Sequence, residues 1–229
     1  TEAHPTDETQ LMLVVEPGRA YVRGYQVDKP TSTRIAVPRS LTTRLIQNES
    51  FYFSTANQKS KLGNKPVASI SKVAGQVAVV KETVNRGVVG DSMDSLSKSS
   101  VFAVTKVWTE VGGVESKVYV AGTDYQLVNG SAIDWSPAGL EPAAGTTYYV
   151  SYTYMKTMIK DTDYKVTITG EGDNRIWYID FTGMTGARPL ANTLVLTDYN
   201  YYLARKDLVV LDQGGDITVH LGQPDSTNA

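Results

Sequence analysis

Apolar and polar residues alternate with a period of two along much of the chain, which is the pattern of β-strands that bury one face. The clearest example is the strand predicted at 146–155. One face of this strand carries the side chains Tyr148, Val150, Tyr152 and Tyr154. No window of eleven residues combines a helical apolar stripe with capping residues. The pattern therefore predicts an all-β fold of antiparallel strands.

Turn-forming residues divide these predicted strands into hairpins. Gly112-Gly113 separates strands expected at 101–111 and 116–121, and Ala74-Gly75 is expected to turn the chain between 67–73 and 76–82. Asn129-Gly130 is the residue pair that a type I′ turn prefers, because both of its central residues need a positive φ. The run 212–216 predicts a further turn between two strands near the C-terminal end.

The opening stretch Leu11–Val27 is interpreted as two strands joined at Glu16–Arg19. Pro17-Gly18 is typical of a turn, because proline presets φ and glycine accepts a positive φ. Two polar stretches, 56–66 and the serine-rich 89–100, predict loops.

The breaks in the pattern predict β-sandwich-like modules, two in number. Residues 10–57 together with 158–222 are expected to form a discontinuous outer domain, into which 66–156 is inserted as a second domain. Residues 1–9 and 223–229 are expected to be flexible ends or linkers. The polar start without methionine suggests an excerpt of a longer or processed polypeptide rather than a signal peptide.

The triplet Thr-Asp-Tyr occurs at 123–125, 162–164 and 197–199. The first two copies lie about 39 residues apart, and each precedes a strand, a polar turn, another strand and a tryptophan, Trp135 or Trp177. An internal duplication is one interpretation. The other is ordinary turn chemistry, because aspartate before a strand is locally favoured.

Composition narrows the functional classes. The 229 residues carry a net charge of −2, which argues against nucleic acid as the main partner. The absence of cysteine excludes disulfides and thiolate metal sites. No apolar run approaches the roughly 20 residues needed to cross a bilayer, so no membrane insertion is expected.

Candidate catalytic chemistry is sparse. His4 and His220 are the only histidines and do not suggest a nucleophilic triad. No glycine-rich phosphate loop is present. Acid pairs occur at Asp91 with Asp94, at Asp134 with Glu141, and at Asp161 with Asp163. A glycosidase or a calcium site could use such pairs, but each acid occupies a turn or strand end. We therefore predict no enzyme, no cofactor and no metal.

The aromatic residues Tyr148, Tyr152, Tyr154 and Trp135 allow two interpretations. They form the core or a subunit interface, or they stack on sugar rings in a receptor-binding groove. Core or interface is favoured. A second aromatic group lies beside Arg205 and consists of Tyr199, Tyr201 and Tyr202.

Three segments resemble large structural proteins of tailed bacteriophages, of the tail-fibre or baseplate-associated kind. They are VVEPGRAYVRGYQV at 14–27, GTDYQLVNGSAIDWSPAGLEPAAGTTYYVSYTY at 122–154, and YNYYLARKDLVVLDQGGDITVHLGQP at 199–224. The last contains a Tyr-Leu-x-Arg-x-Asp run before a hairpin and a Gly-x-Pro exit. The chain lacks the long N-terminal part that such proteins usually carry.

The resemblance implies a structural component of the virion, in a tail fibre, a baseplate or the attachment between them. It would act through assembly with other phage tail proteins and as a homo-oligomer, for example a trimer. The alternative is a module that binds a host-surface glycan.

Overall fold

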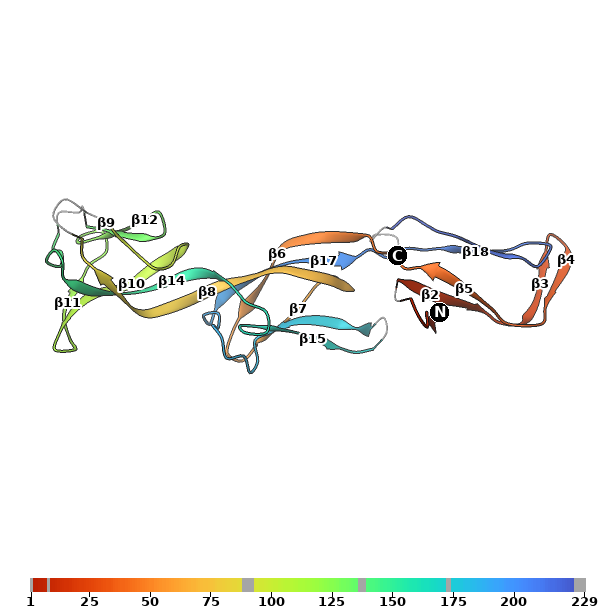
Figure 1. Cartoon of the computed structure of the whole chain (residues 1–229), viewed down its shortest axis with the longest axis horizontal. Helices are drawn as coiled ribbons and strands as arrows, with labels where there is room; N and C mark the ends of the chain where they lie inside the picture. Colours follow the sequence, from red (N-terminus) through yellow and green to blue (C-terminus); the bar gives the residue numbers. More distant parts are fainter. Residues whose placement is uncertain (1, 8, 88–92, 136–138, 172–173, 225–229) are drawn as a thin grey trace. The chain divides into compact units, whose positions relative to one another are not determined.

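The computed structural model describes residues 2–7, 9–87, 93–135, 139–171 and 174–224. All regular elements within these ranges are β-strands, so the predicted all-β class is confirmed (Figure 1). The strands are β1 Glu2–Ala3, β2 Gln10–Val15, β3 Gly18–Val22, β4 Tyr25–Lys29, β5 Thr33–Pro38, β6 Thr43–Phe53, β7 Lys59–Lys61, β8 Val67–Asn85, β9 Met93–Ser95, β10 Val101–Val111, β11 Val114–Tyr119, β12 Gln126–Val128, β13 Ala132–Asp134, β14 Thr147–Thr157, β15 Lys165–Thr169, β16 Ile176–Asp180, β17 Thr193–Tyr202, β18 Leu208–Leu211 and β19 Ile217–His220.

The chain divides into two compact units. Unit 1 comprises Thr1–Ile46, Asn64–Ser69 and Asn200–Ala229, and unit 2 comprises Gln47–Gly63 and Ile70–Tyr199. Three of the four boundaries between the units fall within β6, β8 and β17, and the fourth, between Gly63 and Asn64, lies between β7 and β8. These units are defined by where contacts within the chain are dense, and they say nothing of which part folds alone. The independent folding of 66–156 therefore stays a prediction.

The largest sheet has six strands in the order β11-β10-β14-β8-β17-β6. Two three-stranded sheets accompany it, in the orders β12-β13-β9 and β15-β16-β7. β14 pairs antiparallel with both β10 and β8. The inward face of β14 carries Tyr148, Val150 and Tyr152, all fully buried, as the alternation predicts.

Unit 2 contains the same strand arrangement twice. β8 leads through β9 to β10, and the later hairpin β12–β13 leads into β14, which lies between β8 and β10. In the same way β6 leads through β7 to β8, and the hairpin β15–β16 leads into β17, between β6 and β8. In both cases the short strand pairs with the second strand of the hairpin.

We call residues 70–157 the inner module, and residues 47–85 with 158–199 the outer module. The two modules share β8, and the inner module is nested within the outer one in sequence. The structure thus favours internal duplication over chance for the Thr-Asp-Tyr repeat at 123–125 and 162–164. Thr197-Asp198-Tyr199 lies inside β17 and is not a third copy.

Several predicted boundaries are wrong. β8 runs unbroken from Val67 to Asn85 where a turn at Ala74-Gly75 was expected. Gly75 instead permits close packing, because an added Cβ would lie 3.2–3.4 Å from Met158, Val195 and Pro189. The predicted loops 56–66 and 89–100 contain β7 and β9, although 89–92 lies outside the described residues.

Unit 1 contains a three-stranded sheet, β1-β2-β5, and two hairpins, β3–β4 and β18–β19. The expected pairing of the two arms of Leu11–Val27 is wrong, because β2 pairs with β5 and β3 pairs with β4. The turn lies at Arg23-Gly24, where φ is +51° and +86°. Two successive left-handed residues match the right-handed twist of a tight hairpin. Residues 2–3, in the expected flexible lead, pair with β2.

Candidate functional site

The two modules share a tyrosine–glutamate lock. In the outer module the Tyr199 hydroxyl donates to Oε2 of Glu49 at 2.7 Å, and Oε1 accepts the Gly63 backbone N–H at 2.8 Å. In the inner module the Tyr152 hydroxyl donates to Glu82, whose Oε1 accepts the Ser97 N–H at 2.6 Å. Each lock ties the last long strand of its module to the first strand and to the residue after a buried leucine.

Both modules also contain what we call an aspartate clamp, a carboxylate that accepts backbone N–H groups from two separate loops. Asp124 accepts the N–H groups of Val120 and Leu140, each at 2.8 Å. Asp163 accepts the N–H groups of Ile159 at 2.8 Å and Ala187 at 2.7 Å, and it also binds Lys156 Nζ at 2.6 Å.

Glycine is required beside each clamp. A Cβ on Gly139 would lie 2.3 Å from the carbonyl oxygen of Thr123, and one on Gly186 would lie 2.2 Å from Oδ1 of Asp163. Both distances are far inside normal contact, so each aspartate reaches its second loop only because a glycine stands there. These clamps organise turns, as the turn interpretation of the acids predicted.

The clamp carboxylates are held in their charged form. Backbone hydrogen bonds from Val120 and Leu140 lower the pKa of Asp124 below its ordinary value. Burial acts to raise the pKa of Asp163, but hydrogen bonds from Lys156, Ile159 and Ala187 outweigh burial and leave the pKa lowered. An acid with a lowered pKa is poorly suited to donate a proton at neutral pH.

The inner module contains one further polar cluster, centred on the buried Asp94. Its Oδ2 accepts the Trp135 indole N–H and the Tyr148 hydroxyl, both at 2.9 Å, and its Oδ1 accepts the Gly87 N–H at 2.8 Å. Arg86 lies 3.6 Å from Asp94. Burial and the neighbouring Asp94 charge raise the pKa of Tyr148, so this phenol stays protonated. Every oxygen of the carboxylate is used by the fold.

The acid pairs picked out from the sequence have separate structural partners. Asp134 accepts from Gln126 at 2.7 Å, whereas Glu141 binds Arg86 at 2.7 Å. Asp91 lies outside the described residues, and its predicted partner Asp94 belongs to the buried cluster. Within the ranges that the structure describes, no three His, Asp or Glu side chains are grouped to hold a metal ion.

The predicted stacking residues are mostly inaccessible. Tyr148 and Tyr152 are fully buried and Trp135 nearly so, while Tyr154 is half-buried. The Trp135 ring packs edge-on against Tyr119 and Tyr148 with centroids 5.2 Å apart. Burial raises the pKa of Tyr152 to about 12, helped by its bond to Glu82. Burial places Tyr148, Tyr152 and Trp135 in the core, where their rings are not accessible to a sugar.

The segment 199–224 forms a clasp in unit 1. Arg205 pairs with Asp207 through Nε at 2.8 Å and donates to the Pro38 carbonyl at the end of β5. Asp207 also accepts the Gly222 N–H at 2.9 Å. A Cβ on Gly222 would lie 2.0 Å from the Lys206 carbonyl oxygen, which explains this glycine. The Arg-x-Asp run and the glycine of the exit are thus structural.

The segment 14–27 contributes a polar sheet face. On the hairpin β3–β4, Arg19 pairs with Asp28 at 2.5 Å, and Tyr21 donates to Gln26 at 3.1 Å. The Tyr21 side chain is 71% exposed. This face differs from the predicted aromatic site, and the alternation of Tyr21 and Arg23 was its only signal in the sequence.

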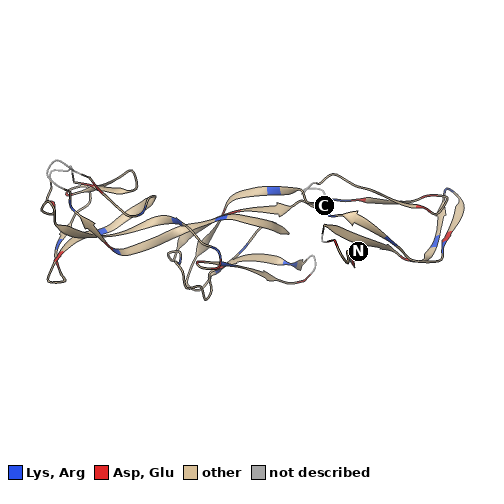
Figure 2. Ribbon diagram, viewed as in Figure 1, with Lys and Arg blue, Asp and Glu red and all other residues tan. Residues whose placement is uncertain are grey.

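Apolar side chains also remain exposed along other strands of unit 1. All six residues of β2, QLMLVV, are only half-buried, and Leu208 and Val209 of β18 are exposed. Figure 2 shows both strands without charge. An uncharged apolar strand surface cannot bind a polyanion, but it can pack against protein.

The comparison with protein families matches all of residues 1–229 to a domain of unknown function, DUF4815. The chain belongs to the DUF4815 family. No curated protein and no solved structure matches this DUF4815 chain. Among the residues that the structure describes, no helix has the length and hydrophobicity to cross a bilayer.

Proposed function

We propose that the chain is a structural component of a bacteriophage tail, in a fibre, a baseplate or the attachment between them. It works by assembly with other tail proteins and with copies of itself, and it performs no catalysis. The resemblance of 14–27, 122–154 and 199–224 to tail-fibre and baseplate-associated proteins supports the position in the virion.

One structural observation carries the assembly part of this proposal. The acids that suggested a site from the sequence, such as Asp94 and Asp163, form hydrogen bonds within the fold itself. The apolar strands β2 and β18 of unit 1, in contrast, contain no fully buried residue. A protein whose polar groups hold its own backbone and whose apolar strands face outward is suited to joining neighbours.

The glycan-binding alternative loses its best residues, because Tyr148, Tyr152 and Trp135 are buried. A glycosidase would need a free acid pair across a cleft. Asp134 and Glu141, the leading pair, are instead bonded to Gln126 and Arg86.

The test is to locate the chain in particles. Phage particles from a strain that encodes the chain are purified, and an antibody against it is used for immunogold electron microscopy. We expect label at one position on the tail, and a fixed copy number by quantitative mass spectrometry. A chain that stays entirely in the particle-free fraction would contradict the proposal.

A further inference from the structure

We infer that unit 1 is an interface between copies of this chain, in which β2 and β18–β19 of one copy are covered by a second copy. This inference takes its partner class, protein, from the proposed assembly function. It adds the surface that is used, and of the two kinds of partner named there it assigns this surface to a second copy.

The first step is the small core of unit 1. The described residues bury twenty-five apolar side chains, and only Val27, Tyr201 and Leu203 belong to unit 1, although unit 1 holds about a third of the chain. Seven large apolar side chains of unit 1 are exposed, namely Tyr21, Tyr25, Leu41, Leu45, Leu208, Val209 and Leu221. In unit 2 buried apolar side chains outnumber exposed ones.

The second step is the pattern of individual strands. β2 and β18 are apolar on both faces, which is typical of strands covered on both sides. Neither strand contains a fully buried residue. Two-stranded hairpins such as β18–β19 are marginally stable in water without a packed face. The apolar pattern of β2 and β18 thus predicts burial on both faces, and unit 1 alone does not provide it.

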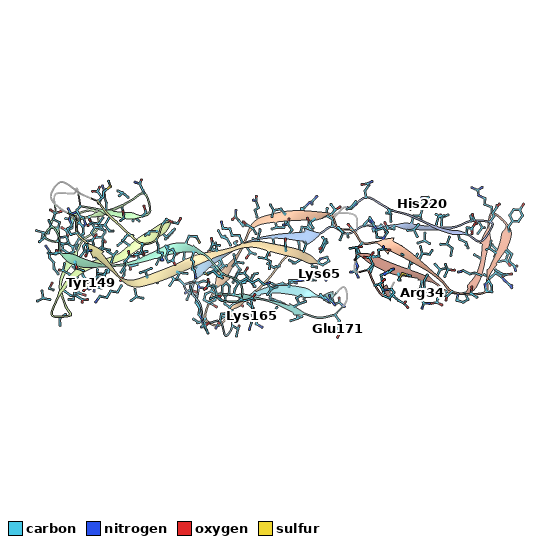
Figure 3. All side chains as sticks on the ribbon, viewed as in Figure 1. Arg34, Lys65, Tyr149, Lys165, Glu171 and His220 are labelled. Carbon is cyan, nitrogen blue, oxygen red and sulfur yellow. The ribbon has the colours of Figure 1, made fainter. Side chains whose placement is uncertain are left out.

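The third step identifies the partner by charge. β2, β18 and β19 contain no Lys, Arg, Asp or Glu (Figure 2). Arg34 of the neighbouring β5 is paired with Glu2 at 3.6 Å, and His220 ends β19 (Figure 3). The Lys and Arg residues of unit 1 equal its Asp and Glu residues in number. Two copies can therefore bring these strands together without placing like charges against one another. A strongly charged partner would find no opposite charges on these strands.

The fourth step is size. β2 and β5 contain six residues each, and β18 and β19 contain four each. A standard interface uses about 20–30 residues a side and buries about 800 Å² per partner. Successive side chains of a strand point to opposite faces, so one face of these strands offers about half of their residues. We therefore expect an association that is weak and depends on concentration.

The free edges of the unit 2 sheet are less suited to self-association. The pairing of the edge strand β11 with β10 shifts in register between Thr109 and Glu110 of β10, and Asn48 in the other edge strand, β6, has a φ of +55°. Such irregularities prevent strands from adding to an edge. This leaves the apolar strand faces of unit 1 as the surface for a second copy.

The test measures the mass of the purified full chain by size-exclusion chromatography with light scattering over a range of concentrations. We expect a multiple of 25.0 kDa. Leu208→Lys places a charge on a side chain that is 63% exposed in the single chain. It should raise the dissociation constant about tenfold or more, because a desolvated charge in an apolar interface is costly.

The matched control is Ile168→Lys in β15 of unit 2, an isomeric side chain that is 52% exposed. It should leave the mass unchanged. A 25.0 kDa monomer at all concentrations, or equal effects of the two variants, would overturn the inference.

Hydrogen exchange keeps the test decisive if Leu208→Lys fails to fold. In the unaltered chain, amides of β2 and β18 should gain protection as concentration rises, while those of β14 should not. Protection independent of concentration would refute the interface. A self-associating chain that is absent from phage particles would refute the proposed function alone, and a monomeric chain found in the tail would refute only this inference.

Discussion

The inner and outer modules of unit 2 use the same hydrogen bonds around different core side chains. Trp135 follows Asp134 at the centre of the inner module, and Phe181 follows Asp180 at the equivalent place in the outer module. Phe181 packs against Phe53 with a centroid distance of 5.4 Å, and Trp135 against Tyr148 at 5.2 Å. Phe181, rather than Trp177, is the counterpart of Trp135.

The difference explains where a buried carboxylate is needed. Ile133 pairs with Asp94 in the inner module, and Ile179 pairs with Ser60 in the outer module. The inner core contains the Trp135 indole N–H and the Tyr148 hydroxyl, which both require an acceptor. The outer core has Phe181 and Val195 at the equivalent positions, both fully buried, and their side chains require none. The aspartate clamps and the tyrosine–glutamate locks therefore occur in both modules because the modules share a topology. Asp94 occurs only in the inner module because Trp135 and Tyr148 need an acceptor there.

The most severe test of the comparison is to separate the modules. A fragment of residues 66–156 contains every strand of the inner module, including the shared β8, except for Thr157 at the end of β14. We expect it to fold cooperatively and to give dispersed amide signals by NMR. An unfolded fragment, with the full chain folded under the same conditions, would show one indivisible core.

Asp94→Ala should cause the largest loss among single substitutions. It removes the acceptor of Trp135 and Tyr148 and leaves the buried Arg86 without Asp94, so we expect a loss of about 3–5 kcal/mol in the free energy of unfolding. Urea denaturation measures it. Ser60→Ala, at the equivalent position, should change stability by less than about 0.5 kcal/mol. Similar losses in both variants would contradict the assignment.

Gly186→Ala and Gly139→Ala should destabilise both modules alike. The added methyl group must displace an aspartate clamp, at a cost of about 1–3 kcal/mol in each case. Thermal unfolding of each variant checks this. Gly18→Ala is the control, since nothing lies within 4 Å of its added Cβ. If only one of the two variants lost stability, the modules would share their strand arrangement but not a functioning clamp.

Tyr199→Phe and Tyr152→Phe should each cost about 1.5 kcal/mol, because a hydrogen bond to a charged carboxylate is lost while the ring remains. Chemical denaturation of the pair tests whether the two locks are equivalent. Tyr52→Phe, at an exposed position, serves as the reference and should have an effect close to zero. An effect in one lock alone would break the equivalence.

The smallest effect concerns pH. The pKa of Asp163 is lowered below its ordinary value of 3.8 in the folded chain, so the unfolded chain binds this proton more tightly. The stabilisation is complete above about pH 3.8 and is lost as pH falls through the folded pKa, with a slope of at most about 1.4 kcal/mol per pH unit. Asp163→Asn should flatten acid unfolding in this window relative to Ser60→Ala. An unchanged pH profile would exclude this role.

The sequence by itself determined the strand class, most hairpins and the buried face of β14. Each depends on local alternation or on turn residues, as at Gly112-Gly113 and Asn129-Gly130, where the backbone preference acts within a few residues. It also indicated the Thr-Asp-Tyr repeat, because the clamp aspartate bonds partly to its own turn.

Only the tertiary structure decided which strands pair and what the acids do. β2 meets β5 rather than β3, and Gly75 serves close packing rather than a turn, because both depend on residues distant in sequence. Asp94 finds its partners 41 and 54 residues away. No local pattern encodes such distances, since they arise when the nested modules bring separate strands around one core.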